Sequence, residues 1–237
     1  MDQTSFETFR ELATRGTFVP VCKQIRADLL TPLSAFLKVA EHADHAFLFE
    51  SVDGGEQIAR YSFLGKDPFL VLRSEDGKTV IDEDGTSRIE EGLFLDRLRD
   101  VMGDYQAPVV PGLPRFTGGA VGFLGYDTAS WFEPCLKETS VNRKKHSIEG
   151  DEAAFMLFDT ILAFDHVKHR ILVIANARVN PGVDLELSYS LACAKIHFLE
   201  EELGRNLSSG VERPKSSFKV RSNTTQEDFE KAVLLAK

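Results

Sequence analysis

The chain has 237 residues, 43% hydrophobic and 27% charged, which are the proportions of an ordinary globular protein. Its formal net charge of −9 comes without any stripe of clustered Lys and Arg, which argues against a nucleic-acid partner. No apolar run approaches the ~20 residues of a membrane span, and the N-terminus lacks the features of a secretory signal. The cysteines are few and far apart, as in proteins of a reducing compartment. We therefore expect a cytoplasmic protein without a membrane partner.

The first forty residues predict a helix, a strand and a second helix. Thr4 begins the first helix, because a glutamate three residues later completes the spacing of a reciprocal helix cap. Residues 17–21 are predicted to form an edge strand, since their proline cannot donate to a neighbouring strand. Thr31 followed by Pro32 predicts another helix start, and an apolar face follows it: Leu33, Phe36, Leu37 and Ala40.

Residues 47–51 are a continuous apolar run that ends in Glu50 and Ser51. Such a run predicts a short strand covered on both faces. Burying a carboxylate or a hydroxyl without a partner is costly. Glu50 and Ser51 are therefore either solvated at the end of the strand or held there to meet a polar ligand.

The rest of the chain predicts further hairpins and helices. We expect a hairpin of strands 68–74 and 78–82, a helix over 94–102, a rigid connector over 106–114, strands over 155–164 and 170–177, and a long helix from Leu185 that Gly204 ends. Clustered hairpins and helices without a repeating βα unit favour an α+β fold. We expect a largely antiparallel sheet sandwich with flanking helices.

The C-terminal stretch indicates a division of the chain. Residues 1–205 form one predicted region, and residues 206–218 are polar enough to be a linker. Thr225 then caps an amphipathic helix that has no evident packing partner. We therefore expect residues 219–237 to be the start of a second, truncated domain.

Few residues of this chain have the pattern of a catalytic centre. The glycine-rich segment 113–127 matches neither the dinucleotide nor the P-loop phosphate pattern, and its glycines favour a strand approached closely by another backbone. The histidine pairs His42/His45 and His166/His169 lack a third ligand nearby. We predict no catalytic and no metal-binding residue here.

Several segments together resemble the N-terminal portion of the large subunit of anthranilate synthase, component I, and more loosely that of aminodeoxychorismate synthase. The segments that carry the resemblance are Phe49-Glu50-Ser51, residues 60–65 with Asp67-Pro68, residues 116–119 and 125–127, and residues 222–225 leading into Phe229. The resemblance covers essentially the whole chain. It also implies an anthranilate synthase-like fold for the N-terminal region.

The resemblance implies a lyase of tryptophan biosynthesis that converts chorismate and ammonia to anthranilate and pyruvate. Such an enzyme uses Mg²⁺, and a glutamine amidotransferase partner, component II, delivers the ammonia. In that family the chorismate and metal residues lie in a C-terminal catalytic portion, which would begin near Ser217. A fragment that lacks this portion is expected to be inactive.

The resemblance further implies a feedback site for L-tryptophan, at which Glu50 and Ser51 match the family motif and Arg60 falls near a basic ligand contact. Successive side chains of a strand point to opposite faces, so we expect Ser51 to enter the pocket and Glu50 to contribute its backbone or a more distant contact. Arg60 is equally compatible with a cation whose stem lies along apolar surface at a strand end.

Two alternatives stay open at this point. The first is the large subunit of aminodeoxychorismate synthase in the folate pathway, whose corresponding pocket holds tryptophan as a structural ligand. The second is a stand-alone amino-acid-binding module. The product made from chorismate separates the first alternative from anthranilate synthase, and the reading frame after Lys237 tests the second.

Overall fold

The computed structural model describes residues 3–26, 30–50, 60–75, 77–83, 85–133, 135–136, 151–206, 222 and 224–237. The chain divides into two compact units, Met1–Asn206 and Leu207–Lys237. The described part of the second unit is the helix α8 (Gln226–Ala236), whose cap is Thr225, as predicted. Most of the predicted linker lies outside the described residues, and the predicted domain start at residue 219 stays a prediction.

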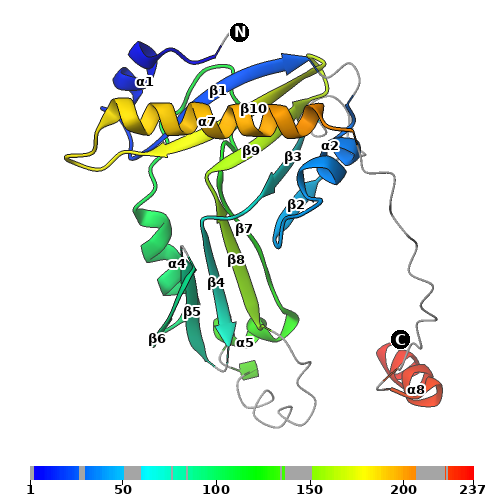
Figure 1. Cartoon of the computed structure of the whole chain (residues 1–237). Helices are drawn as coiled ribbons and strands as arrows, with labels where there is room; N and C mark the ends of the chain where they lie inside the picture. The colour runs from blue at the N-terminus through cyan, green and yellow to red at the C-terminus, as the bar shows by residue number, and fades with distance from the viewer. Residues whose placement is uncertain are drawn as a thin grey trace. The chain divides into compact units, whose positions relative to one another are not determined.

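The first unit contains two five-stranded sheets, each antiparallel throughout (Figure 1). Sheet A consists, in spatial order, of β1 (Phe18–Arg26), β10 (Arg170–Arg178), β9 (Thr160–Asp165), β3 (Tyr61–Lys66) and β2 (Ala46–Phe49). Sheet B consists of β6 (Thr86–Glu90), β5 (Lys78–Glu83), β4 (Leu70–Glu75), β8 (Ala153–Phe158) and β7 (Gly119–Leu124). The predicted α+β class and antiparallel sheets are confirmed.

Two neighbouring strands pass from one sheet into the other. β8 runs into β9 through Asp159, and β3 runs into β4 through residues 67–69. Asp67 has a positive φ of 51°, which lets the chain turn sharply before Pro68. The single strand predicted over residues 155–164 is therefore wrong: it is two strands in different sheets, because the backbone bends at Asp159.

Three helices cover one face of sheet A. α7 (Leu185–Gly204) packs across β10 and β1, α1 (Phe6–Leu12) packs against α7 and β1, and α2 (Pro32–Val39) packs beside β3 (Figure 1). The predicted core face of α7 is confirmed, since its buried side chains include Ala192, Ile196, Leu199 and Leu203. Against sheet B lies α4 (Phe94–Gly103), while η1 (Tyr126–Thr128) and α5 (Ala129–Phe132) follow β7.

The structure corrects two predictions about the helices. The cap of α1 is Ser5, because Thr4 instead hydrogen-bonds the backbone of Cys22 on β1. The N-cap of α2 is Thr31, as predicted, but the helix buries Pro32, Ala35 and Val39. Its predicted apolar face is wrong in part: Phe36 packs against the core, but Leu33 and Leu37 are 54% and 49% exposed.

β2 is also less covered than its apolar sequence predicts. It has four residues and lies at the edge of sheet A, with Phe49 54% exposed. An apolar run alone does not distinguish an edge strand, with one face open, from an interior strand. Phe49 is therefore part of an exposed aromatic surface next to Glu50.

Gly122 tests how tightly β7 and β8 pack. A Cβ at this position would meet the carbonyl oxygen of Ala154 and the backbone of Phe155, whereas one at Gly103, at the end of α4, would meet nothing within 4 Å. We expect Gly122→Ala to lower the free energy of unfolding by about 1–3 kcal/mol because the strands must separate. The same substitution at Gly103 is expected to leave stability unchanged or raise it by up to ~1 kcal/mol. Urea unfolding of both variants measures the difference, and equal effects would contradict it.

Candidate functional site

The end of β2 and the beginning of β3 border an open, shallow cavity of about 370 Å³. Its lining is Leu48, Phe49, Glu50, Tyr61 and Phe63. The hydrogen-bonding register places Phe49 opposite Phe63, and the rings of Tyr61 and Phe63 lie 5.9 Å apart. Three of its five lining residues are therefore aromatic, and Glu50 belongs to the lining as well.

The structure describes two of the three residues that are predicted to bind tryptophan. Glu50 follows β2 directly and is exposed. Ser51 lies outside the described residues. Arg60 stands immediately before β3, so the chain brings Glu50 and Arg60 to the same end of the β2–β3 pair. Their roles in ligand binding stay predictions.

Arg60 is held at both its backbone and its side chain. Its carbonyl oxygen accepts a hydrogen bond from the N–H of His166 at 3.0 Å. Its guanidinium donates from Nε and Nη2 to the two carboxylate oxygens of Asp165, at 3.1 and 3.0 Å. This fork geometry fixes the guanidinium plane, with Cζ 4.8 Å from the centre of the Tyr61 ring. Arg60 is thus ordered beside the aromatic cavity.

A second arginine shares the same carboxylate. Arg170 donates from Nε to Asp165 at 3.3 Å, from Nη1 to Gln24 at 2.9 Å and from Nη2 to the carbonyl oxygen of Gly112 at 3.3 Å. The Asp165 side chain is fully buried, and Arg60 is 34% exposed. One carboxylate balances only one of the two guanidinium charges, so the cluster Arg60–Asp165–Arg170 has a net positive charge.

The electrostatics of Asp165 follow from these contacts. Burial alone would raise the pKa of Asp165, but the hydrogen bonds from Arg60 and from the Lys168 N–H, together with the arginine charges, outweigh burial and lower it. The hydrogen bond to Asp165 raises the pKa of Arg60 in turn. The pair is therefore ionised at neutral pH.

Sequence reasoning missed Asp165 and Arg170 as parts of this site. Asp165 was expected in the turn between two apolar strands and Arg170 at the start of the second strand, and the structure pairs the two residues across β9 and β10. The available signal was an aspartate at the end of a strand that is otherwise buried throughout, since such a carboxylate needs a cationic partner.

The remaining polar candidates do not form a reactive centre in the described residues. Ser62 Oγ and His166 Nε2 are 2.8 Å apart, but Ser62 is fully buried. Burial raises the pKa of the Cys22 thiol to about 11, which keeps it protonated. Among the described residues, no group of three His, Cys, Asp or Glu side chains is placed to hold a metal ion, and no helix is long and apolar enough to cross a bilayer.

Sequence comparison identifies relatives of this chain. It is 37% identical over 236 residues to "Anthranilate synthase component 1" of Acetivibrio thermocellus, a match that covers 95% of this chain and 46% of that protein. This chain is a homologue of about half of anthranilate synthase component 1. The proteins of that name from Synechocystis and Pseudomonas aeruginosa are 35% and 34% identical, over 100% and 96% of this chain and 48% and 46% of their own lengths.

The chain therefore spans about half the length of the curated relatives it matches. No protein-family model matches the sequence. Among solved structures, anthranilate synthase component I from Streptococcus pneumoniae aligns with a TM-score of 0.47 and 24% identity, over 77% of this chain and 36% of that one. The relationship to anthranilate synthase component 1 rests on the sequence matches.

Asp165→Asn tests the charge cluster. Because the folded-state pKa of Asp165 is depressed, its contribution to stability is present above its unfolded pKa of about 3.9 and is lost as pH falls through the lower folded-state value. We expect the variant to lose about 3 kcal/mol of unfolding free energy at pH 7, because it leaves Arg170 buried without its counter-charge. The loss should shrink as pH falls below about 4.

Asp82→Asn is the matched control. Asp82 pairs with Arg73 at 2.9 Å, but both side chains are about a third exposed, at 34% and 36%. An exposed pair contributes about 1 kcal/mol or less, so Asp82→Asn should cost far less than Asp165→Asn. Denaturant titrations at pH 7 and pH 3 measure both variants, and similar costs would show that Asp165 is not the buried centre of the cluster.

Proposed function

We propose that this chain is the N-terminal, regulatory and scaffold part of an anthranilate synthase component 1. The observation that supports the proposal is the 37% identity over 95% of this chain to a protein of that name, less than half of which it spans. The complete component would convert chorismate and ammonia to anthranilate and pyruvate in tryptophan biosynthesis, in the cytoplasm. A glutamine amidotransferase, component II, would supply the ammonia.

The proposal places the chemistry outside this chain. A Mg²⁺ site needs converging carboxylates with water and substrate oxygens, and the described residues do not fit such a site. We therefore assign Mg²⁺ and chorismate binding to the part of the component that this chain does not span.

The role that we assign to this chain is the recognition of L-tryptophan. A free amino acid needs an acceptor for its ammonium group, a donor for its carboxylate and an apolar slot for its side chain. At the β2–β3 end, Glu50 with Ser51 would supply the acceptor, Arg60 the donor, and the aromatic cavity the slot for the indole. The net positive charge of the Arg60–Asp165–Arg170 cluster favours the carboxylate at this end.

Turnover by the purified chain tests whether the chemistry lies outside this chain. We expect no anthranilate or pyruvate when the chain alone is given chorismate, Mg²⁺ and ammonia, because the groups that bind them are missing. The complete component should release both products under the same conditions. Release of pyruvate by the chain alone at the rate of the complete component would contradict the proposal, and aminodeoxychorismate as the product would identify the folate-pathway relative instead.

Ser51→Phe in the complete component tests the feedback site. A phenyl ring in place of the hydroxyl would fill the indole slot and remove an acceptor, so we expect the tryptophan concentration for half inhibition to rise at least about tenfold. Most of the uninhibited activity should remain, because no catalytic group is touched. Ser190→Phe on the exposed side of α7 is the control and should be inhibited normally. Normal inhibition of Ser51→Phe would overturn the assignment of that residue.

A further inference from the structure

A larger cavity, of about 480 Å³, lies on the helix-covered side of sheet A. Its floor is the β3–β9 pair, with Leu64 and Leu162, and the flank of α7 forms one wall with Leu191 and Phe198. The volume is within the range of about 300–1,000 Å³ that is typical of small-molecule pockets. The cavity is at the Lys66 end of β3, whereas Arg60 precedes the other end of that strand.

The walls of this cavity are apolar and incompletely covered. Leu64 and Leu162 are buried in the floor, but Leu191 and Phe198 of α7 are 57% and 50% exposed. The two side chains lie seven residues apart, on the same side of the helix, two turns from each other. They provide a slot for a large apolar group against the sheet.

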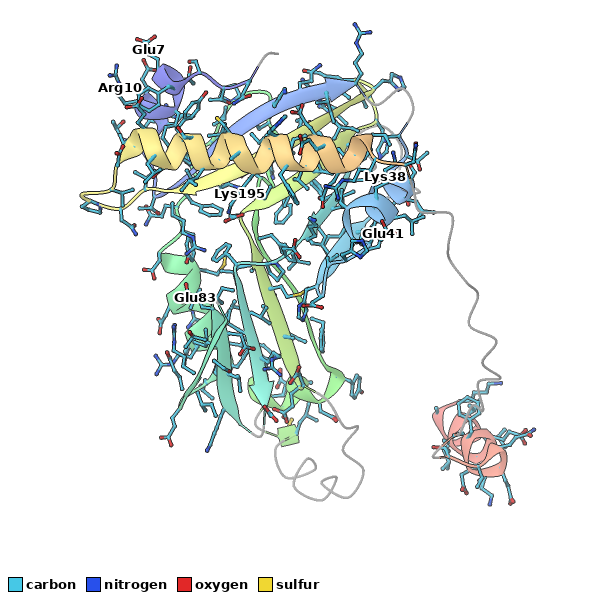
Figure 2. The ribbon with its side chains drawn as sticks, in the orientation of Figure 1. Glu7, Arg10, Lys38, Glu41, Glu83 and Lys195 are labelled. Carbon is cyan, nitrogen blue, oxygen red and sulfur yellow. The ribbon has the colours of Figure 1, made fainter. Side chains whose placement is uncertain are left out.

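Charged groups of both signs converge where β3 and β9 meet the bend. Lys195 lies on α7 (Figure 2). Its Nζ is 2.6 Å from Asp159 Oδ2, and Thr160 Oγ1 donates to Asp159 Oδ1 at 2.7 Å. Lys66 Nζ lies 3.5 Å from Asp67 and 5.2 Å from the centre of the Phe198 ring. Asp159 is only 8% exposed. The lining therefore contains two cations and two carboxylates beside an apolar slot.

Lys66 connects this lining to an acceptor without a partner. Its Nζ lies 2.7 Å from Oε1 of Glu202, a residue that is only 7% exposed. The other oxygen of that carboxylate, Oε2, is buried and has no hydrogen-bond partner among the described residues. Glu202 does not line the cavity, and its ion pair already occupies Lys66, so Lys195 is the cation of the lining that is left to meet an anionic group.

We propose that this cavity binds a zwitterionic α-amino acid with a large apolar side chain. The side chain occupies the slot between Leu191, Phe198 and the sheet, the ligand carboxylate meets Lys195, and its ammonium meets Asp159 and Asp67. A ligand with no net charge matches a lining with no net charge, while its two ends match groups of opposite sign. This site is separate from the tryptophan site proposed at Glu50 and Arg60.

Calorimetry of the purified chain with three related probes tests the ligand class. L-Phenylalanine carries both charges, 3-phenylpropionate lacks the ammonium, and 2-phenylethylamine lacks the carboxylate. We expect L-phenylalanine to bind at least about tenfold more tightly than either analogue, because each analogue lacks one of the two charges that the lining would recognise. Equal affinities for the three probes would overturn the proposal. So would the absence of any heat of binding for L-phenylalanine at 10 mM, because a specific site should show at least about millimolar affinity.

Two leucines of α7 locate the site. Leu191 lines the cavity, and Leu187, one turn earlier, does not, although they are nearly equally exposed, at 57% and 58%. Leu191→Arg should weaken L-phenylalanine binding at least about tenfold by filling the slot, and Leu187→Arg should leave it unchanged. Equal effects of the two substitutions would overturn the assignment.

Ser51→Phe separates this inference from the proposed function. It should leave L-phenylalanine binding in this cavity unchanged, whatever its effect on inhibition by tryptophan. Loss of L-phenylalanine binding in that variant would place the ligand at the Glu50 end and overturn the inference. Normal L-phenylalanine binding together with normal tryptophan inhibition of the complete component would instead support this site and contradict only the proposed feedback residue.

Discussion

The bend at which two adjacent strands change sheets is the constraint on which the first unit depends. At Asp159 and at residues 67–69 the backbone leaves one ladder before it enters the other, so its polar groups need partners there. At residues 67–69, the N–H of Asp67 donates to the carbonyl oxygen of His45 at 3.0 Å and that of Phe69 to Leu157 at 2.9 Å. At Asp159 the partner is Asn176 of β10. Its N–H donates to the carbonyl oxygen of Asp159 at 2.7 Å, and its Nδ2 donates to the same oxygen at 2.9 Å and to that of Thr117 at 2.7 Å. Gly118 follows with a φ of 148°, and a Cβ at that position would meet the amide of Asn176. At Asp159 the bend thus depends on one buried amide that supplies hydrogen bonds and on one glycine that leaves room for this amide.

The bend also determines where charge is placed in sheet A. Between its ends the sheet is covered on both faces, and side chains such as Leu64, Leu162 and Leu172 are 1% exposed or less. Charged groups consequently gather at the two ends of its strands. Arg60, Asp165 and Arg170 lie at one end, and Lys66, Asp67 and Asp159 lie at the bend. The charges at the bend line the larger cavity, and Arg60 contacts Tyr61 in the lining of the smaller one. Side chains that must stay hydrated or paired cannot fill apolar space.

Local sequence signals predicted the elements whose causes are local. The hairpin of β4 and β5, the Thr31 and Thr225 caps and the core face of α7 follow from short-range spacing, and the structure has all of them. Features set by distant partners were not predictable. The buried face of α2 depends on where the sheet lies beneath it, and β6 at the edge of sheet B has no apolar alternation to reveal it.

The same distinction applies to the candidate site. Glu50 and Arg60 were predicted from the resemblance to a family motif, but Asp165 contacts Arg60 across 105 residues of chain. Only the pairing of β3 with β9 brings them together, with Tyr61 opposite Asp165. A sequence can indicate that a carboxylate at a strand end needs a cation, and the topology decides which cation that is.

Sheet A places its two groups of charges at opposite ends of one strand. Residues 60–66 separate them by about 20 Å at ~3.3 Å per residue. The interior of β3 is held on both sides, by β2 and β9, and Ser62 and Leu64 are buried to within 1%. A strand packed in this way does not slip along its neighbours, because a slip of one residue would move every side chain to the other face. Any coupling between ligands at the two ends must therefore act through the bend, where the chain leaves its ladder, and would require two arrangements of the bend that the ligands stabilise differently.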